Sequence, residues 1–129
     1  MQAQILIAED EPDIAASLEF LLDNDGYQTQ IARDGMTALA IAKASPPDLI
    51  VLDLMLPKLS GLEVAAAIRA NVADRQPKIL MLTARGGAGD VARSRLAGVD
   101  AYLVKPFSTK ELLESVRHLL ATKGRAHAA

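Results

Sequence analysis

The 129-residue sequence contains no cysteine, no tryptophan and very few other aromatic residues. Because cysteine is absent, disulfide bonds and thiolate metal sites are excluded. Aromatic residues make up 3% of the chain although half of it is hydrophobic, so the core must consist of leucine, isoleucine, valine and alanine. A chain of this length has the size of one domain and can bury such a core without covalent staples.

The sequence also lacks an excess of either charge and any long hydrophobic run. Its net charge of -2 gives no bulk electrostatic reason for binding to nucleic acid or to an anionic membrane. No apolar run approaches the ~20 residues that span a bilayer, and the N-terminus has no basic stretch followed by an apolar one. We therefore expect a soluble, cytoplasmic domain that contacts neither nucleic acid nor membrane directly.

One stretch organises the chain. The apolar run Leu49–Leu52 ends at Asp53 and is followed by a loop that contains Pro57 and Gly61. A run of this kind, rich in branched residues, predicts a strand buried on both faces. A carboxylate at the end of such a strand either caps the next turn or belongs to a ligand site, because a charge placed there costs free energy unless something compensates it.

Strand and helix patterns alternate five times along the sequence. The strands are expected at 4–8, 27–31, 49–53, 78–82 and 101–104, and helices follow each of them. This alternation predicts an α/β fold, a doubly wound (βα)5 five-stranded parallel sheet in a flavodoxin-like three-layer sandwich. The polar second strand suits an edge, which favours the strand order 2-1-3-4-5. In that order the crevice between the carboxyl ends of the first and third strands is the expected binding site.

The predicted helices differ in the strength of their apolar faces. The helix at about 90–96 has only a thin apolar stripe, so we expect it to be the least stable. Ser108 and Glu111 form the sequence pattern of a capping box at the start of the last helix. In the second helix, which begins after an Asp-Gly pair, four residues are expected to be available for packing: Met36, Leu39, Ala40 and Ala42.

Polar residues stand at the ends of four predicted strands. Glu9 and Asp10 follow the first strand, Asp53 ends the third, Thr83 the fourth and Lys105 the fifth. Three carboxylates in one crevice repel one another and need a cation, and an all-oxygen ligand set suits Mg²⁺ or Mn²⁺. Together with an ammonium and a hydroxyl, this set is equipped to handle a phosphoryl group, with a carboxylate as the nucleophile.

Four segments carry a resemblance to a known family. They are Ile5–Glu11, Asp53–Pro57 with Gly61, Leu82–Arg85 and Asp100–Phe107. On these segments the chain resembles the receiver (response regulator) domain of bacterial two-component signal transduction. The resemblance covers the chain from residue 4 to about residue 122. It implies a receiver domain over residues 1–122, and a flexible polar tail or the start of a linker over 123–129.

The resemblance implies a role for each residue of the crevice. Asp53 would be the phosphoacceptor, taking a phosphoryl group from a phosphohistidine on a sensor histidine kinase or a phosphotransfer protein. Mg²⁺ would be held by Glu9, Asp10, Asp53 and the backbone carbonyl of Met55. The domain would catalyse only its own phosphotransfer and slow autodephosphorylation, and is not expected to be an enzyme in any other sense. The side chains of Met55 and Arg85 would set the lifetime of the phosphoaspartate.

Three further residues would carry the signal. Lys105 would pair with the phosphoryl oxygens, Thr83 would hydrogen-bond one of them on activation, and Tyr102 would be the switch aromatic that then turns inward. The face formed by the fourth helix, fifth strand and fifth helix would control a downstream effector protein or a covalently linked output domain. Thr83 as a plain strand end and Tyr102 as a core aromatic are the simpler alternatives.

The sequence departs from the family pattern at two positions. Glu9 stands where the family more often has Asp, and Ala101 replaces the second Asp of a frequent Asp-Asp-Tyr sequence. In the transcription-factor branch that second Asp joins ion pairs across a dimer face, so Ala101 weakens the expectation of a phosphorylation-dependent homodimer. Other residues could still supply partners at that face: Asp90, Arg93, Asp100, Lys110, Glu111 and Arg117.

Proteins of other classes match the sequence less well. A flavodoxin-type FMN binder needs a phosphate loop after the first strand, where three consecutive acids would repel phosphate. A phosphatase of the haloacid dehalogenase type needs a second Asp two residues after the first, where this chain has Met55. A receiver-like binding module that is never phosphorylated stays open as the alternative. The kinase, the output and the natural end of the chain are not given by these residues.

Overall fold

The computed structural model describes residues 2–71, 76–84, 93, 95 and 97–122. Five parallel strands form one sheet in the order β2-β1-β3-β4-β5. The strands are β1 (Gln4–Ala8), β2 (Gln28–Ala32), β3 (Leu49–Asp53), β4 (Lys78–Thr83) and β5 (Ala101–Val104). The helices with assigned bounds are α1 (Pro12–Asn24), α2 (Gly35–Ala44), α3 (Gly61–Ala70) and α5 (Thr109–Ala121). The predicted fold class and strand order are confirmed.

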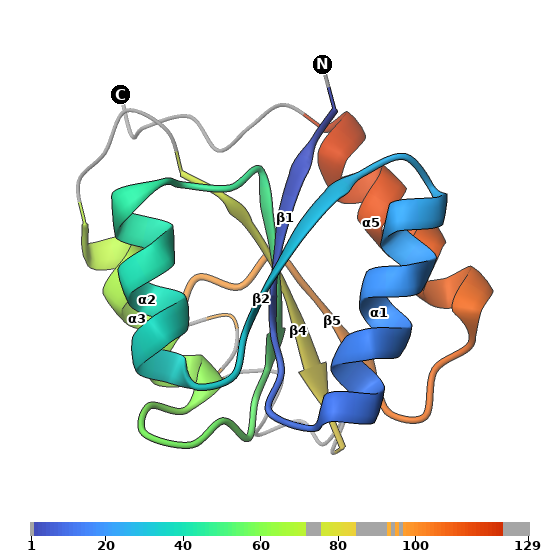
Figure 1. Cartoon of the computed structure of the whole chain (residues 1–129). Helices are drawn as coiled ribbons and strands as arrows, with labels where there is room; N and C mark the ends of the chain where they lie inside the picture. The colour runs from blue at the N-terminus through green and yellow to red at the C-terminus, as the bar shows by residue number, and fades with distance from the viewer. Residues whose placement is uncertain (1, 72–75, 85–92, 94, 96, 123–129) are drawn as a thin grey trace.

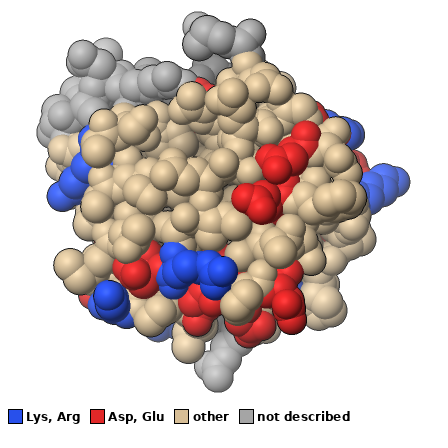
Figure 2. All heavy atoms as spheres, in the orientation of Figure 1, with Lys and Arg blue, Asp and Glu red and all other residues tan. Residues whose placement is uncertain are grey.

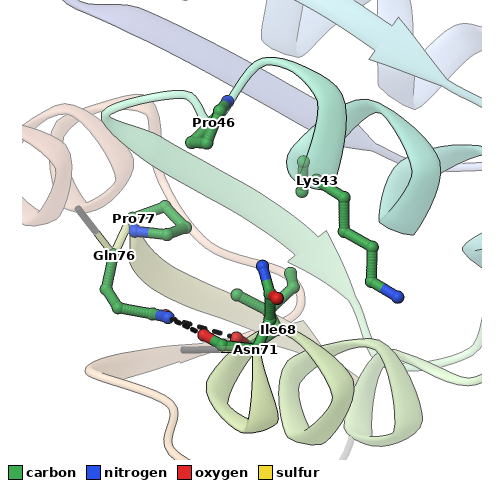
Figure 3. A pocket seen from close by; sticks show the side chains of 7 residues that line it. Lys43, Pro46, Ile68, Asn71, Gln76 and Pro77 are labelled. Atoms are coloured by element: carbon green, nitrogen blue, oxygen red, sulfur yellow. Dashed lines mark hydrogen bonds between the residues drawn. The ribbon is translucent and has the colours of Figure 1, made fainter. Parts of the chain in front are cut away.

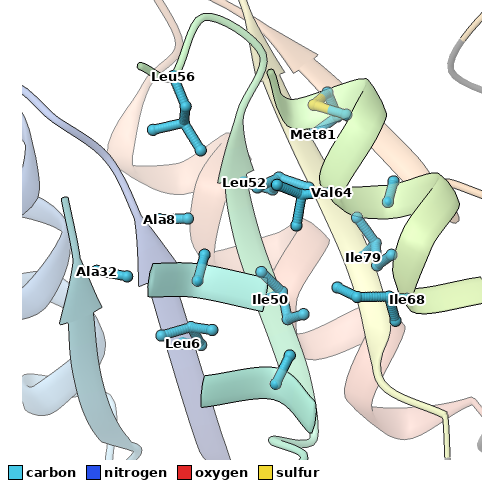
Figure 4. Close-up of a cluster of buried hydrophobic side chains, with 13 residues drawn as sticks. Leu6, Ala8, Ala32, Ile50, Leu52, Leu56, Val64, Ile68, Ile79 and Met81 are labelled. Carbon is cyan, nitrogen blue, oxygen red and sulfur yellow. The ribbon is translucent and has the colours of Figure 1, made fainter. Parts of the chain in front are cut away.

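The helices cover both faces of the sheet, with α1 and α5 on one side and α2 and α3 on the other (Figure 1). Side chains alternate along each strand, so Ile5 and Ile7 of β1 join the cluster under α1 and α5, while Leu6 and Ala8 join the other. Figure 4 shows the cluster under α2 and α3, in which Ile50 and Leu52 of β3 lie among residues from these two helices. All five residues of β3 are buried, as a central parallel strand requires.

Local signals in the sequence explain where the helices begin. Ser60 and Glu63 form a capping box at α3, and Ser108 and Glu111 form the predicted one at α5. At α2 the side chain of Asp34 accepts a hydrogen bond from the backbone N–H of Thr37. A helix whose first N–H groups have acceptors begins at a defined residue, and the loop before it is fixed with it.

Two expectations for the second strand and helix were wrong. The strand β2 spans 28–32 and not 27–31, which moves it by one residue. In α2 the expectation was wrong for Met36, which is 59% exposed, and for Ala40, which is exposed, but it holds for Leu39 and Ala42, which pack in the core. The reason is that the backbone of Gly35 packs closely against a neighbouring loop, and this contact sets which face of the helix is turned inward.

Some predicted features fall outside the described residues. They include Arg85, the proposed tail or linker at 123–129 and most of the predicted helix at about 90–96, of which only Arg93 and Arg95 are described. Among the described residues, no helix combines the length and the apolar character that crossing a membrane would require.

The amino-terminal edge of the sheet is held by Arg69 at the end of α3. Its guanidinium donates hydrogen bonds to the carbonyl oxygens of Gly98 and Pro77 at 2.9 and 2.7 Å, and to the side chain of Gln76 at 2.9 Å. It also pairs with the Asp100 carboxylate, with 2.9 Å between Nη2 and Oδ2. Both charged side chains are largely buried, so the pair ties α3 to the segment before β5.

A shallow hollow lies beside this network, between the ends of α2 and α3 (Figure 3). Lys43 and Pro46 stand on one side of it, and Gln76 and Pro77 on the other. The amide of Gln76 is turned toward the chain and donates to the backbone carbonyls of Ile68 and Asn71. This amide is already satisfied within the chain, so it is not available to a ligand in the hollow.

Candidate functional site

Buried polar side chains gather at the carboxyl edge of the sheet. Among the described residues, only Glu9, Asp53 and Thr83 combine a polar side chain with a buried position. They stand at the ends of β1, β3 and β4, and the helices that follow β1 and β3, α1 and α3, lie on opposite faces of the sheet. Burial of a polar group is costly unless it is compensated, so the three mark this crevice as the part of the molecule built for something other than stability.

Three carboxylates meet in the crevice. Oxygen atoms of Glu9, Asp10 and Asp53 all lie within 4.8 Å of one another, with Asp10 exposed and the other two buried. The ammonium of Lys105 lies 3.3 Å from Oε1 of Glu9 and 3.5 Å from Oδ1 of Asp53. Within the described part of the chain, Lys105 is the cation paired with the two buried carboxylates, so the three carboxylates outnumber the ammonium that contacts them. Figure 2 shows acidic and basic side chains intermingled along the lower edge of the molecule, where the strands end.

The charges in the crevice shift one another's titration. Burial, with Asp53 close by, raises the pKa of Glu9 from 4.5 to about 7, although the backbone N–H of Glu11 and the charge of Lys105 oppose the change. Burial alone would lower the pKa of Lys105, but the Asp53 and Glu9 carboxylates outweigh it and raise that pKa above its ordinary value. Lys105 is therefore a permanent cation, while Glu9 is poised to be neutral when nothing but Lys105 balances it.

The donor chemistry fits a hard divalent cation. Mg²⁺ and Mn²⁺ prefer oxygen ligands, bind through few carboxylates and keep several waters, which suits one exposed and two buried carboxylates. The Met55 backbone lies next to them, because its N–H donates to Oδ1 of Asp53 at 3.3 Å. The same residue has a 75% exposed side chain, which stands at the rim of the crevice beside Asp53.

Two other predicted site residues lie on β4 and β5. Thr83 pairs in register with Val104, and its carbonyl accepts a 2.7 Å hydrogen bond from the backbone N–H of Lys105. The Lys105–Pro106 peptide bond is cis. Tyr102 is opposite Met81 on the edge strand and is 38% exposed, so it is not a core aromatic in this structure. The described chain thus brings Thr83 and Lys105 to the same edge and leaves Tyr102 at the outer surface of β5.

Sequence reasoning missed two contributors to the crevice. Arg33 follows β2, and its guanidinium approaches the backbone carbonyl of Asp10 at 3.5 Å. Gly35 begins α2 and donates its backbone N–H to the carbonyl of Pro57, in the loop after Asp53. The Asp34-Gly35 pair was visible only as a helix start, because nothing in a single sequence indicates which distant loop a glycine will touch.

Two of the residues considered as dimer partners are paired within the chain. Asp100 binds Arg69 and also accepts a hydrogen bond from the backbone N–H of Ile79 at 2.7 Å. Arg117 makes two hydrogen bonds, of 3.0 and 2.8 Å, to the carboxylate of Asp25. In this structure neither side chain is free to join an intermolecular ion pair without giving up an internal one.

Comparison with known proteins assigns the chain to a family. The model of the response regulator receiver domain matches residues 5–117. The chain belongs to this family. The resemblance drawn from four sequence segments is confirmed, and with it the assignment to two-component signalling. Receiver domains are signalling domains.

Curated relatives match over nearly the whole chain. The "DNA-binding response regulator MtrA" of Mycolicibacterium smegmatis is 39% identical over 117 residues, which are 91% of this chain and 50% of that protein. The "Response regulator MprA" of Mycobacterium bovis is 41% identical over 120 residues, which are 93% of this chain and 51% of that protein. The chain therefore spans about half the length of the curated relatives it matches.

A solved structure agrees in fold. The receiver domain of the sensor histidine kinase PA1611 from Pseudomonas aeruginosa has a TM-score of 0.86 and 32% identity, and the match covers 95% of this chain and all of that one. Its description states that a magnesium ion is coordinated in the active site cleft of that protein.

Proposed function

We propose that this receiver domain is a phosphorylation-activated switch in which Asp53 accepts a phosphoryl group from a phosphohistidine. The observation that carries the proposal is the shared contact of Lys105 with two buried carboxylates, one of which ends the central strand β3. A carboxylate held beside a permanent cation at the mouth of a crevice is an oxygen nucleophile with a built-in partner for the incoming phosphoryl oxygens.

The transfer needs no other covalent chemistry from the protein. An oxygen of Asp53 attacks the phosphorus, the P–O bond forms as the P–N bond to the donor histidine breaks, and the imidazole leaves with the electron pair and takes up a proton. Lys105 stays charged throughout, because Asp53 and Glu9 raise its pKa, and it pairs with the phosphoryl oxygens. Positioning and charge therefore supply the rate enhancement.

Mg²⁺, or Mn²⁺, is the proposed cofactor. Glu9, Asp10 and Asp53 would hold it together with the backbone carbonyl of Met55. When bound, the ion would offset the surplus negative charge of the crevice and neutralise phosphoryl oxygens. The magnesium-bearing receiver domain of the PA1611 kinase supports this choice.

The signal would leave through Thr83 and Tyr102. Thr83 would hydrogen-bond the phosphoryl group, and the half-exposed Tyr102 would turn inward, so that phosphorylation shifts an existing equilibrium at the β5 and α5 face. The proposed upstream partner is a sensor histidine kinase or a phosphotransfer protein. Downstream we propose an effector protein or a linked output domain, since the curated relatives are about twice as long and one is named as DNA-binding.

Phosphorylation by a small acyl phosphate in the presence of Mg²⁺ tests the proposal. The wild-type chain should gain the mass of one acid-labile phosphoryl group, and Asp53→Asn should gain none. Asp23→Asn is the matched control, because Asp23 is an exposed acid on α1 whose carboxylate accepts a hydrogen bond from the Thr29 hydroxyl, and asparagine can accept the same bond. Stoichiometric, acid-labile phosphorylation of Asp53→Asn would show that another residue is the acceptor.

The alternative, a receiver-like module that is not phosphorylated, makes the opposite prediction for a phosphoryl analogue. Beryllofluoride with Mg²⁺ should bind the wild-type chain at Asp53 and alter amide exchange in β5. A chain that binds no beryllofluoride would favour the module. In the absence of metal, Asp53→Asn should also be more stable than the wild type, because it removes one of three mutually repelling carboxylates.

A further inference from the structure

The first turn of α2 is in backbone contact with the loop that follows Asp53. The N–H of Gly35 donates a hydrogen bond to the carbonyl of Pro57 at 3.1 Å. A Cβ atom at Gly35 would collide with the backbone carbonyl and the Cβ of Leu59. The obstructing atoms are backbone atoms and a Cβ that is fixed to the backbone, so they cannot move aside as the end of a flexible side chain would, and only glycine fits here.

The Pro57 carbonyl also closes a tight turn within its own loop. It accepts a second hydrogen bond, of 2.9 Å, from the N–H of Leu59, which makes a γ-turn centred on Lys58. The φ of Lys58 is 71°, a left-handed conformation that is costly for a residue with a side chain. The turn is therefore held in a strained shape, and the N–H of Gly35 is one of the groups that hold it.

The same loop is fixed on either side of Met55. The carbonyl of Leu54 accepts a 2.8 Å hydrogen bond from the N–H of Gly61, and the side chain of Leu56 is buried in the core under α2 and α3. Only one residue separates Met55 from Pro57. A shift of Pro57 of about 1 Å cannot be absorbed by so short a segment, since each residue spans at most about 3.6 Å.

We propose that Gly35 is a positioning residue for the phosphoryl-transfer site, although α2 contributes none of its ligands. Its N–H sets the loop at 54–60, and the loop sets the Met55 carbonyl and the N–H that Met55 donates to Asp53. This inference rests on the proposed function and extends it to a residue that touches neither metal nor phosphate. The position of the Met55 carbonyl matters because Mg²⁺ tolerates little error in the position of its ligands.

The ion pair between Lys58 and Asp34 does not explain the contact between Gly35 and the loop after Asp53. Lys58 and Asp34 lie 3.9 Å apart, and the lysine side chain is 64% exposed, so the pair is weakened by solvent. The backbone hydrogen bond and the close approach of Gly35 are shielded by comparison, because Gly35 is buried. The glycine, and not the surface charge, is therefore the residue to test.

Magnesium binding to Gly35→Ala, measured by calorimetry, tests the proposal. Displacing the loop should weaken magnesium binding by about tenfold. This is the lower end of the loss in metal affinity seen when a residue that supports a metal ligand is changed. The amide resonance of Met55 in the metal-free protein should move as well, which reports the loop without any metal or activity.

Gly26→Ala is the matched control. Gly26 has a φ of 94°, and a Cβ there would meet nothing within 4 Å, so the change is strained but remote from the crevice. It should lower stability without altering magnesium affinity or the Met55 resonance. Equal magnesium affinity in the folded fractions of Gly35→Ala and Gly26→Ala would overturn the proposal.

A second pair of variants covers the case in which Gly35→Ala does not fold. Asp34 caps α2 through a 2.7 Å hydrogen bond from the N–H of Thr37, and asparagine can replace that acceptor whereas alanine cannot. Both substitutions remove the same charge. Asp34→Ala should therefore bind Mg²⁺ about threefold more weakly than Asp34→Asn, because the first turn frays and Gly35 with it. Equal affinity in these two variants would contradict the inference.

Failure of the inference and failure of the proposed function give different results. Magnesium affinity is measured without a phosphodonor, so the role of Gly35 is judged separately from phosphorylation of Asp53. A wild-type chain that binds Mg²⁺ but takes no phosphoryl group overturns the proposed function and leaves the positioning role standing. A wild-type chain that binds no Mg²⁺ overturns both.

Discussion

The amino-terminal and carboxyl edges of the sheet differ in how their charged side chains are paired. At the amino-terminal edge one guanidinium meets one largely buried carboxylate, and the short hydrogen bonds of Arg69 reach three further acceptors. At the carboxyl edge three carboxylates gather, and among the described residues the Lys105 ammonium contacts two of them, at the longer distances of 3.3 and 3.5 Å. The first edge is complete within the chain. The second has a cluster of carboxylates that, on the proposed function, a bound cation would complete, and this difference distinguishes a structural site from the candidate functional one.

The largest effect should come from breaking the complete edge. Arg69→Ala leaves the largely buried Asp100 without its guanidinium, and loss of one partner of a buried pair costs about 3–5 kcal/mol. Urea unfolding measures the change. Arg69→Lys should recover only part of it, because an ammonium cannot reproduce the fork of a guanidinium. Full stability in Arg69→Ala would mean that the pair holds nothing together.

Binding of Mg²⁺ at the carboxyl edge should stabilise the protein, by somewhat less than the loss of stability expected for Arg69→Ala. Ligand linkage predicts a gain of about 2.7 kcal/mol when Mg²⁺ is present at a hundred times its dissociation constant. Thermal unfolding with and without Mg²⁺ measures this gain, with Ca²⁺ as a comparison ion. The gain should shrink in Asp53→Asn, and an equal gain in both chains would place the ion elsewhere.

Neutralising Glu9 should stabilise the metal-free protein above neutral pH. The raised pKa means that the contribution of Glu9 is fully present below pH 4.5 and is lost as the pH rises through about 7. The glutamine of Glu9→Gln does not ionise, so the variant keeps this contribution at every pH. Above pH 7 the variant should therefore be more stable than the wild type by on the order of 2 kcal/mol. Chemical unfolding from pH 5 to pH 8 follows the divergence. If the free energy of unfolding depends on pH in the same way for the wild type and the variant, then the negative charge of Glu9 is compensated in the folded wild-type protein.

The smallest effect should come from the exposed pair between Arg117 and Asp25. Hydrogen bonds from Arg117 lower the pKa of Asp25, so the contribution of this carboxylate is present above its ordinary pKa of 3.8 and fades as the pH falls below it. Arg117→Ala should change stability little at pH 7, and less still in high salt. A large, salt-independent loss would mean that this surface pair resembles the buried one.

Much of the fold could be predicted because the responsible signals are local. The all-apolar run before Asp53 and the polar segment that follows α1 distinguish a central strand from an edge strand. Once the strand order is known, geometry alone brings Glu9, Asp53 and Lys105 to one edge. That step uses the topology of the sheet and needs no knowledge of side-chain conformations.

The features that escaped prediction are those that depend on long-range contacts. Arg69 and Asp100 are separated by 31 residues and carry no common pattern, so their pairing was not expected, and Asp100 was considered for a dimer face instead. The orientation of α2 was misjudged at Met36 because it is decided by the contact of Gly35 with the loop after β3. The chemical roles of Asp53, Thr83, Tyr102 and Lys105 stay predictions until they are measured.

Hydrogen exchange at both edges in one experiment tests the comparison most directly. Saturating Mg²⁺ should slow exchange at the backbone amides of Met55 and Gly61, beside the carboxylate cluster. At the complete edge, the amides of Ile79 and Asp100 should slow less, by no more than the gain in global stability that Mg²⁺ confers on every amide exchanging through complete unfolding. Uniform slowing at both edges, or no slowing at either, would contradict the claim that only the carboxyl edge of the sheet awaits a cation.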